Sequence, residues 1–245
     1  IVDNTVATPY LLKPINYGAD IVIHSTTKYI TGNGTSIGGI IIDAGNFDWS
    51  SGLFDEFTTP SAGYHGLVYH EALGPAAFIA KARIEGLRDL GSAPSPFNCF
   101  QTIQGLETLS VRIKKHSENA LKVAKWLENQ DKVAWVNYPG LKSSKYNNLS
   151  KKYLKNGQSG IVTLGLKGGF DSAKKLTDST KIFSLLANFG DSKSLIIHPS
   201  STTHQQLNEE QQKSTGVTAD LVRLSIGLED PLDLINDLKD ALSSI

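Results

Sequence analysis

A lysine and two hydroxyl side chains stand together directly after a short apolar run. The run Ile21–His24 precedes Ser25, Thr27 and Lys28. A free amine held at the end of a strand can attack a carbonyl carbon. Residues two apart in an extended segment point to the same side, so the two hydroxyls can together hold an oxyanion such as phosphate. The segment therefore predicts carbonyl chemistry on a molecule that carries a phosphate.

An acidic residue ends a second apolar segment at the start of the chain. Asp3 follows Ile1 and Val2 and lies 25 residues before Lys28. A carboxylate at a strand end often caps a turn, but it can also pair with a ring nitrogen and keep that nitrogen protonated. A lysine, hydroxyls for a phosphate and an acid are what pyridoxal 5'-phosphate (PLP) requires of a protein. We therefore expect PLP as the cofactor.

Segments along nearly the whole chain resemble one enzyme family. The segments Val2-Asp3-Asn4-Thr5, Ser25-Thr26-Thr27-Lys28-Tyr29, His198-Pro199-Ser200-Ser201 and Leu221–Glu229 resemble the PLP-dependent enzymes of Cys/Met metabolism. The resemblance implies an α/β fold of the aspartate-aminotransferase-like class, fold type I. It also implies that Lys28 is catalytic and binds the cofactor aldehyde, that Asp3 pairs with the pyridine nitrogen, and that Ser25 and Thr27 hold the phosphate.

Three further residues are assigned to the substrate by this resemblance. Arg223 lies in the apolar run Leu221–Ile226 and would hold the substrate α-carboxylate, a task that suits the planar guanidinium. Asn188 occupies a family position that contacts the same carboxylate, and Thr203 would line the same pocket. Taken alone, Arg223 is equally an exposed strand residue and Asn188 equally a turn residue.

The site residues shared by the family leave the reaction open, because all of its reactions begin with removal of the substrate Cα proton. Gly63–Leu67, within the Gly- and aromatic-rich residues 44–75, resembles an insertion of the sulfhydrylases that act on O-acetyl-L-homoserine. This resemblance implies γ-replacement of acetate by sulfide, which gives L-homocysteine. The alternatives are a cystathionine γ-synthase, a methionine γ-lyase, or a non-catalytic piece of a split enzyme.

Composition argues against several other classes of protein. Lysine plus arginine and aspartate plus glutamate each number 24, so no basic field predicts a nucleic-acid partner. The apolar runs are only strand-length, so we expect no membrane span. A single cysteine, Cys99, cannot form an intrachain disulfide, which fits a cytoplasmic location. The histidines lack the spacing of a metal site, so no metal is expected.

Periodicity places these residues on alternating strands and helices. Short β-branched runs predict strands at 21–24, 39–42, 133–138, 160–166, 195–198 and 221–226. Helices are predicted at 75–90, at about 98–130, from Ser172 onward, and after Asp230-Pro231. Continuous apolar strands indicate a sheet covered on both faces. We expect residues 1–101 to be the C-terminal part of a PLP-binding large domain, and residues 102–245 a smaller α+β domain.

Family members carry a long N-terminal part before the segment that corresponds to Val2–Thr5. We therefore expect the chain to be the C-terminal portion of a longer enzyme and to be inactive without the remainder. The resemblance implies that the remainder completes the phosphate site. It also implies a homotetramer, a dimer of dimers, for the complete enzyme. Its small-molecule partners would be an amino acid and sulfide.

Overall fold

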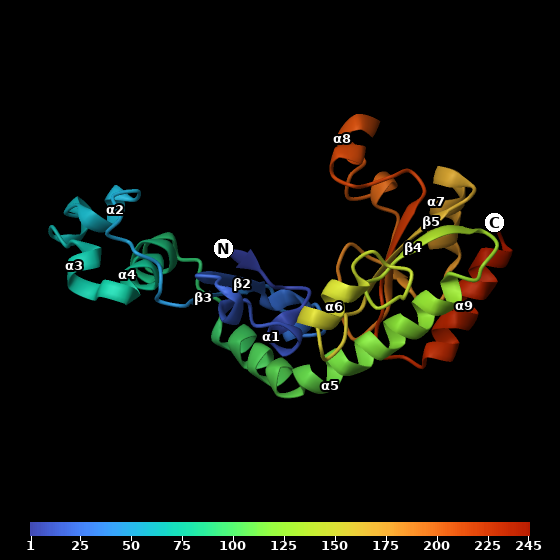
Figure 1. Ribbon diagram of the computed structural model, residues 1–245, viewed down its shortest axis with the longest axis horizontal. Helices are drawn as coiled ribbons and strands as arrows, with labels where there is room; N and C mark the ends of the chain where they lie inside the picture. The colour runs from blue at the N-terminus through green and yellow to red at the C-terminus, as the bar shows by residue number, and fades with distance from the viewer.

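The computed structural model describes all 245 residues and contains two sheets. The first has the order β1-β2-β3, with β1 (Val2–Asp3) parallel and β3 (Gly39–Asp43) antiparallel to β2 (Ile21–Ser25). The second has the order β4-β5-β8-β7-β6, formed by Val133–Asn137, Ile161–Leu166, Leu221–Ser225, Leu195–Ile197 and Ser184–Leu185. Helix α5 (Pro96–Leu127) runs past both sheets (Figure 1).

The remaining helices are shorter, and all but α9, which follows the last strand, come between strands along the chain. They are α1 (Thr8–Leu11), α2 (Asp55–Thr58), α3 (Tyr69–Leu73), α4 (Ala77–Lys81), α6 (Asn147–Tyr153), α7 (Gly169–Ser179), α8 (Glu209–Ser214) and α9 (Pro231–Ser243). The predicted strands and the long helix are confirmed. The helix predicted at 75–90 is instead a 3₁₀ turn, α4 and a π-helical stretch at Ala82–Asp89.

The main core lies between the five-stranded sheet and helices α5, α7 and α9. The α5 residues Ala120, Val123, Ala124 and Leu127 are fully buried in it, as their spacing predicts. At the start of α9 the Asp230 carboxylate accepts a hydrogen bond from the Leu232 backbone amide at 2.8 Å, which confirms the predicted cap. This packing fixes β8, the strand that carries Arg223.

The expectation of a sheet covered on both faces is wrong for β3. Ile40 and Ile41 point to opposite faces of the strand and are 47% and 43% exposed. An apolar run in a sequence indicates that a strand is suited to burial, but it does not show which element packs on that strand. Both faces of β3 are therefore open at these two residues in this chain.

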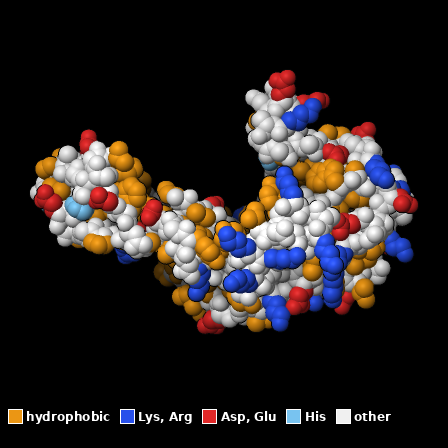
Figure 2. Space-filling model, in the orientation of Figure 1, with side chains coloured by type: hydrophobic (Ala, Val, Ile, Leu, Met, Phe, Trp, Pro, Cys, Tyr) orange, Lys and Arg blue, Asp and Glu red, His pale blue; other side chains and the backbone are white.

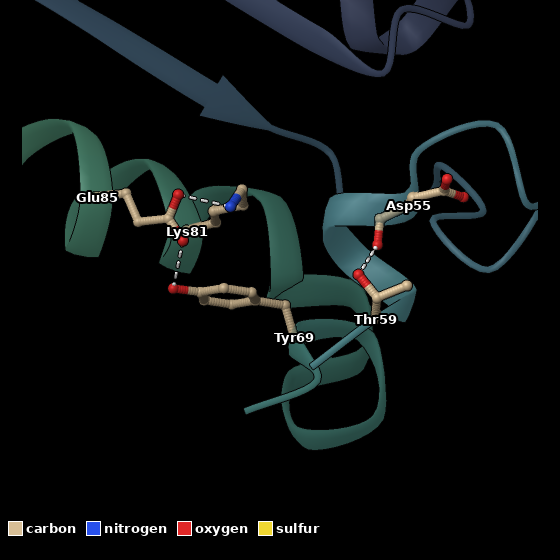
Figure 3. A network of polar contacts seen from close by, with 5 residues as sticks. All are labelled: Asp55, Thr59, Tyr69, Lys81 and Glu85. Carbon is tan, nitrogen blue, oxygen red and sulfur yellow. Dashed lines mark hydrogen bonds and ion pairs between the residues drawn. The ribbon is translucent and has the colours of Figure 1, made fainter. Parts of the chain in front are cut away.

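Residues 44–90 form a lobe that stands away from the two sheets (Figures 1 and 2), and we call it the insertion lobe. Its residues Trp49, Phe57 and Tyr69 form a small core together with Ile21 of β2, which joins the lobe to the first sheet. The Glu85 carboxylate accepts hydrogen bonds from Lys81 Nζ at 2.6 Å and from Tyr69 Oη at 3.0 Å (Figure 3). The predicted long excursion is therefore an ordered, helical unit with its own apolar and polar contacts.

The predicted division of the chain at residues 101 and 102 falls inside α5. This helix packs on the segment that follows β2 and, farther along, on α9, β4 and β5. Its close approach to the first part depends on Gly105, where a Cβ atom would lie 2.4 Å from the Ile30 carbonyl oxygen. One rigid helix thus links the two parts, and the domain boundary stays a prediction.

Candidate active site

Lys28 lies in a tight turn directly after β2. Residues Thr26–Ile30 form a π-helical turn, within which Lys28 itself has the non-helical angles φ −87° and ψ −131°. Single π-helical turns are frequent at functional sites, where they redirect a side chain. The Gly32 amide donates to the Lys28 carbonyl at 2.8 Å and closes the turn. Lys28 is therefore held in the turn that follows the predicted strand, three residues after the strand ends at Ser25.

The Lys28 amine meets two residues that are remote in sequence. Its Nζ donates a hydrogen bond to Asn188 Oδ1 at 2.5 Å. Arg223 Nη2 donates to the backbone carbonyl of the same Asn188 at 3.2 Å. The centroid of the Phe189 ring lies 4.8 Å from Lys28 Nζ and 5.9 Å from Arg223 Cζ, so the ring is a neighbour of both groups. The structure therefore brings Lys28, Asn188 and Arg223 together.

The surroundings of Lys28 favour its neutral form. Burial lowers the pKa of the Lys28 amine, and the positive charge of Arg223 lowers it further. Arg223 is itself half-buried, and its buried Nε has no hydrogen-bond partner. A guanidinium keeps its charge in such a place, so this Nε–H is available to an acceptor that enters the site.

Asp3 is connected to this region through Thr5. Asp3 Oδ1 accepts hydrogen bonds from the Thr5 hydroxyl at 2.6 Å and from the Thr5 amide at 3.0 Å, and these bonds lower the pKa of the carboxyl. The Thr5 hydroxyl in turn accepts from the Ser25 amide at 2.8 Å. Asp3 Oδ2 makes no hydrogen bond within the chain, so an ionised oxygen is left for another donor.

The two hydroxyls differ in their surroundings. The Ser25 hydroxyl makes no hydrogen bond within the chain, whereas Thr27 Oγ1 accepts from the Gly38 amide at 3.1 Å and donates to the Gly38 carbonyl at 3.3 Å. The argument that strand alternation aligns Ser25 with Thr27 is wrong, because β2 ends at Ser25 and Thr27 lies in the π-helical turn. Their shared role toward a phosphate stays a prediction.

Thr203 is not brought to this cluster. It lies in the turns after Pro199–Ser201, is exposed, and its Oγ1 bonds only to His204 Nδ1 at 2.9 Å. No contact joins it to Lys28, Asn188 or Arg223. Its role as a pocket residue therefore rests on the family resemblance alone.

The sequence reasoning missed Phe189 and a group of residues on α5. Phe189 directly follows Asn188, and an aromatic residue beside a site amide is itself a weak signal. Arg112 offered a clearer one, since it shares a helical face with the buried Ala120 and Val123. A charged residue that continues an apolar face must have partners in the interior.

The residues fit the groups of PLP and of an amino acid. An amine biased toward neutrality suits an aldehyde, and the Ser25 hydroxyl suits a phosphate oxygen. Asp3 Oδ2 suits a ring N–H, and the orphaned Arg223 Nε suits a carboxylate. No three His, Cys, Asp or Glu side chains are grouped so that they could hold a metal ion. No helix combines the length and the apolar character that crossing a membrane requires.

Comparisons with known proteins agree with this chemistry. A model of the Cys/Met metabolism PLP-dependent enzyme family matches residues 1–243. The chain is 54% identical to O-acetyl-L-homoserine sulfhydrylase of Leptospira meyeri and 46% identical to homocysteine/cysteine synthase of Saccharomyces cerevisiae. A crystal structure of a putative O-acetylhomoserine (thiol)-lyase from Campylobacter jejuni, which contains a pyridoxyl-lysine phosphate, aligns with a TM-score of 0.92 and 47% identity.

These matches cover all or nearly all of this chain but only part of the other proteins. The alignments span 100% of the chain and 58% of each of the two named relatives. For the Campylobacter structure they span 98% of the chain and 58% of the other chain. The chain thus spans a little over half the length of these relatives.

Proposed function

This chain belongs to the Cys/Met metabolism family of PLP-dependent enzymes, and from that premise we propose that it carries the catalytic lysine and the carboxylate-binding arginine of an O-acetyl-L-homoserine sulfhydrylase. The proposed reaction replaces the acetate of O-acetyl-L-homoserine with sulfide and gives L-homocysteine and acetate. The observation that carries the proposal is the junction of Lys28 and Arg223 at Asn188, because it sets a reactive amine beside a carboxylate-binding group.

PLP, when bound, supplies an electron-withdrawing ring that stabilises negative charge on the substrate Cα. Lys28 would hold the cofactor aldehyde and then, as a free amine, take the Cα proton and deliver protons along the chain of the substrate. Asp3 would accept a hydrogen bond from the ring nitrogen through Oδ2. Ser25 and Thr27 would hold the phosphate.

Arg223 and Asn188 would orient the amino acid. The guanidinium binds the α-carboxylate through paired N–H groups, which fixes the rotation of the substrate about its Cα. The Cα proton then faces the Lys28 amine, which lies beside the same Asn188. The C–O bond from Cγ to acetate breaks, and a C–S bond from Cγ to sulfide forms. Thr203 is proposed as a more distant lining residue.

Cystathionine γ-synthase and methionine γ-lyase are the alternatives within the family. Both use the same cofactor-binding groups, which here would be Asp3, Ser25, Thr27 and Lys28. Three of the similar relatives are named O-acetyl-L-homoserine sulfhydrylase, which favours the sulfhydrylase. We also propose a homotetramer and a cytoplasmic location for the whole protein. The exposed apolar residues Ile40, Ile41 and Phe97 support association with further protein surface.

A substrate comparison on the whole protein tests the proposal. Product formation is measured from O-acetyl-L-homoserine with sulfide, from O-acetyl-L-homoserine with cysteine, and from methionine alone. We expect homocysteine with sulfide to form fastest. The Lys28→Ala variant should lose this activity, whereas Lys13→Ala, which removes an exposed lysine, should keep it. Faster cystathionine formation, or turnover of methionine alone, would assign one of the alternatives.

A further inference from the structure

Helix α5 carries three buried polar side chains on the face that packs inward. Arg112, His116 and Asn119 lie at i, i+4 and i+7, so they share one side of the helix. They are 9%, 0% and 0% exposed. None of them contacts a carboxylate. We call these three residues the polar stripe.

Arg112 binds the backbone directly after Lys28. Its Nη1 donates to the Tyr29 carbonyl at 2.7 Å, and its Nη2 donates to the Ile30 carbonyl at 3.0 Å and to the Gly105 carbonyl at 2.7 Å. Nε donates to the Thr108 hydroxyl at 3.0 Å. The rigid, planar guanidinium thus joins two consecutive carbonyls of the π-helical turn Thr26–Ile30, which contains Lys28, to the backbone of α5.

The other two residues bind the backbone after Arg223. His116 Nδ1 donates to the Ile226 carbonyl at 2.6 Å, because a carbonyl oxygen only accepts. Asn119 Nδ2 donates to the Gly227 carbonyl at 3.0 Å and to the Glu229 carbonyl at 2.8 Å. The His116 ring also meets the Tyr29 ring edge-on at 5.2 Å. The stripe therefore reaches the segments that follow both Lys28 and Arg223.

We propose that the polar stripe consists of positioning residues that set the spacing between the Lys28 amine and the Arg223 guanidinium. This inference rests on the proposed function of those two groups. At the site the two parts of the chain also meet directly, since the Ser192 amide donates to the Gly32 carbonyl at 2.9 Å and the Gly160 amide donates to Tyr29 Oη at 3.1 Å, but neither bond reaches the segment that follows Arg223. A single α-helix that grips both backbone segments supplies a fixed length between them. Arg112 governs the lysine end, and Asn119 governs the arginine end.

The test uses two variants at the lysine end of the stripe and one at the arginine end. Arg112→Met removes the guanidinium and its hydrogen bonds. Arg112→Lys keeps the positive charge but not the paired N–H donors of the guanidinium. Asn119→Leu removes both bonds at the other end. The matched controls are Lys114→Met and Glu118→Leu, because both residues are exposed on the same helix. Near-ultraviolet circular dichroism identifies the folded variants, and if Arg112→Met does not fold, Arg112→Lys decides the question.

Two readouts separate positioning from general stability. The first is the pH at which acetic anhydride labels Lys28 in the cofactor-free whole protein, followed by mass spectrometry. The second is the division between kcat and KM for O-acetyl-L-homoserine in the loaded enzyme. In the folded Arg112 variants we expect acetic anhydride to label Lys28 at higher pH than in the unaltered protein. We expect Asn119→Leu to raise KM about tenfold with a small change in kcat, since two hydrogen bonds are lost.

Folded variants that match the controls in both readouts would overturn the positioning role. Failure of the proposed function would look different. In that case Lys28 of the unaltered protein would label at the pH of an ordinary exposed lysine, and no variant would have a KM to compare. Early labelling of Lys28 in the unaltered protein, combined with unchanged variants, would reject the stripe and leave the proposed function standing.

Discussion

The chemistry proposed for the site depends on an amine that is neutral when a substrate arrives. Burial is the larger cause of the lowered pKa of Lys28, and the Arg223 charge is the second. The same arginine would thus serve two purposes, because we propose that it binds the substrate carboxylate and its positive charge lowers the pKa of the lysine. Lys28 itself could be identified from its sequence neighbours. Its pairing with Asn188, 160 residues away, could not, because it follows from how the two sheets meet.

The Arg223→Leu variant should shift the titration of Lys28 to higher pH, because removing a nearby positive charge makes protonation of the amine easier. Only the neutral amine reacts with acetic anhydride, so labelling of Lys28 should begin at higher pH in the variant. The shift should be partial, since burial remains. Arg223→Lys keeps the charge and should label closer to the unaltered protein. Identical labelling profiles for all three proteins would show that Arg223 has no electrostatic effect on Lys28.

At the scale of elements, α5 does more than its apolar periodicity indicates. The positions that build the core could be predicted from the helical spacing of Ala120, Val123, Ala124 and Leu127. The polar stripe could not, because its partners are backbone carbonyls that a sequence pattern does not mark. A sequence pattern also did not mark the end of β2. Strand alternation would require the strand to continue to Thr27, but it ends at Ser25 and Thr27 lies in the π-helical turn.

The burial of His116 makes acid destabilisation a property of this helix. Its pKa is lowered to about 4 from an ordinary 6.5, mainly by burial. Above pH 6.5 the ring is neutral in both the folded and the unfolded chain, so it has no effect on pH dependence. As the pH falls from 6.5 toward 4, the unfolded chain binds a proton that the folded chain does not, and stability is lost.

The His116→Asn variant should lose much of this acid sensitivity, because asparagine keeps a donor for the Ile226 carbonyl but has no charge to gain. Between pH 7 and 5 the free energy of unfolding of the unaltered protein should fall by up to about 2 kcal/mol more than that of the variant. Urea unfolding at both pH values measures the difference. Equal losses in the two proteins would show that His116 is not the group responsible.

At the scale of the whole molecule, the chain consists of two sheets and an insertion lobe arranged around a broad hollow (Figure 2). A cavity of about 480 Å³ lies between the lobe and the first sheet, and its lining includes Ile21, Trp49 and Phe78 but not Lys28. The alternation of strands and helices predicted the fold class. The arrangement of the lobe and the exposed faces of β3 depend on long-range packing, which short-range patterns do not encode.

The whole protein should carry its cofactor on Lys28. The direct measurement is the visible absorbance spectrum of the purified whole protein before and after borohydride reduction, followed by peptide mapping. The account predicts a yellow absorbance that reduction removes and a pyridoxyl group recovered on the peptide that contains Lys28. A whole protein that stays colourless with added PLP, or a pyridoxyl group found on another lysine, would contradict it.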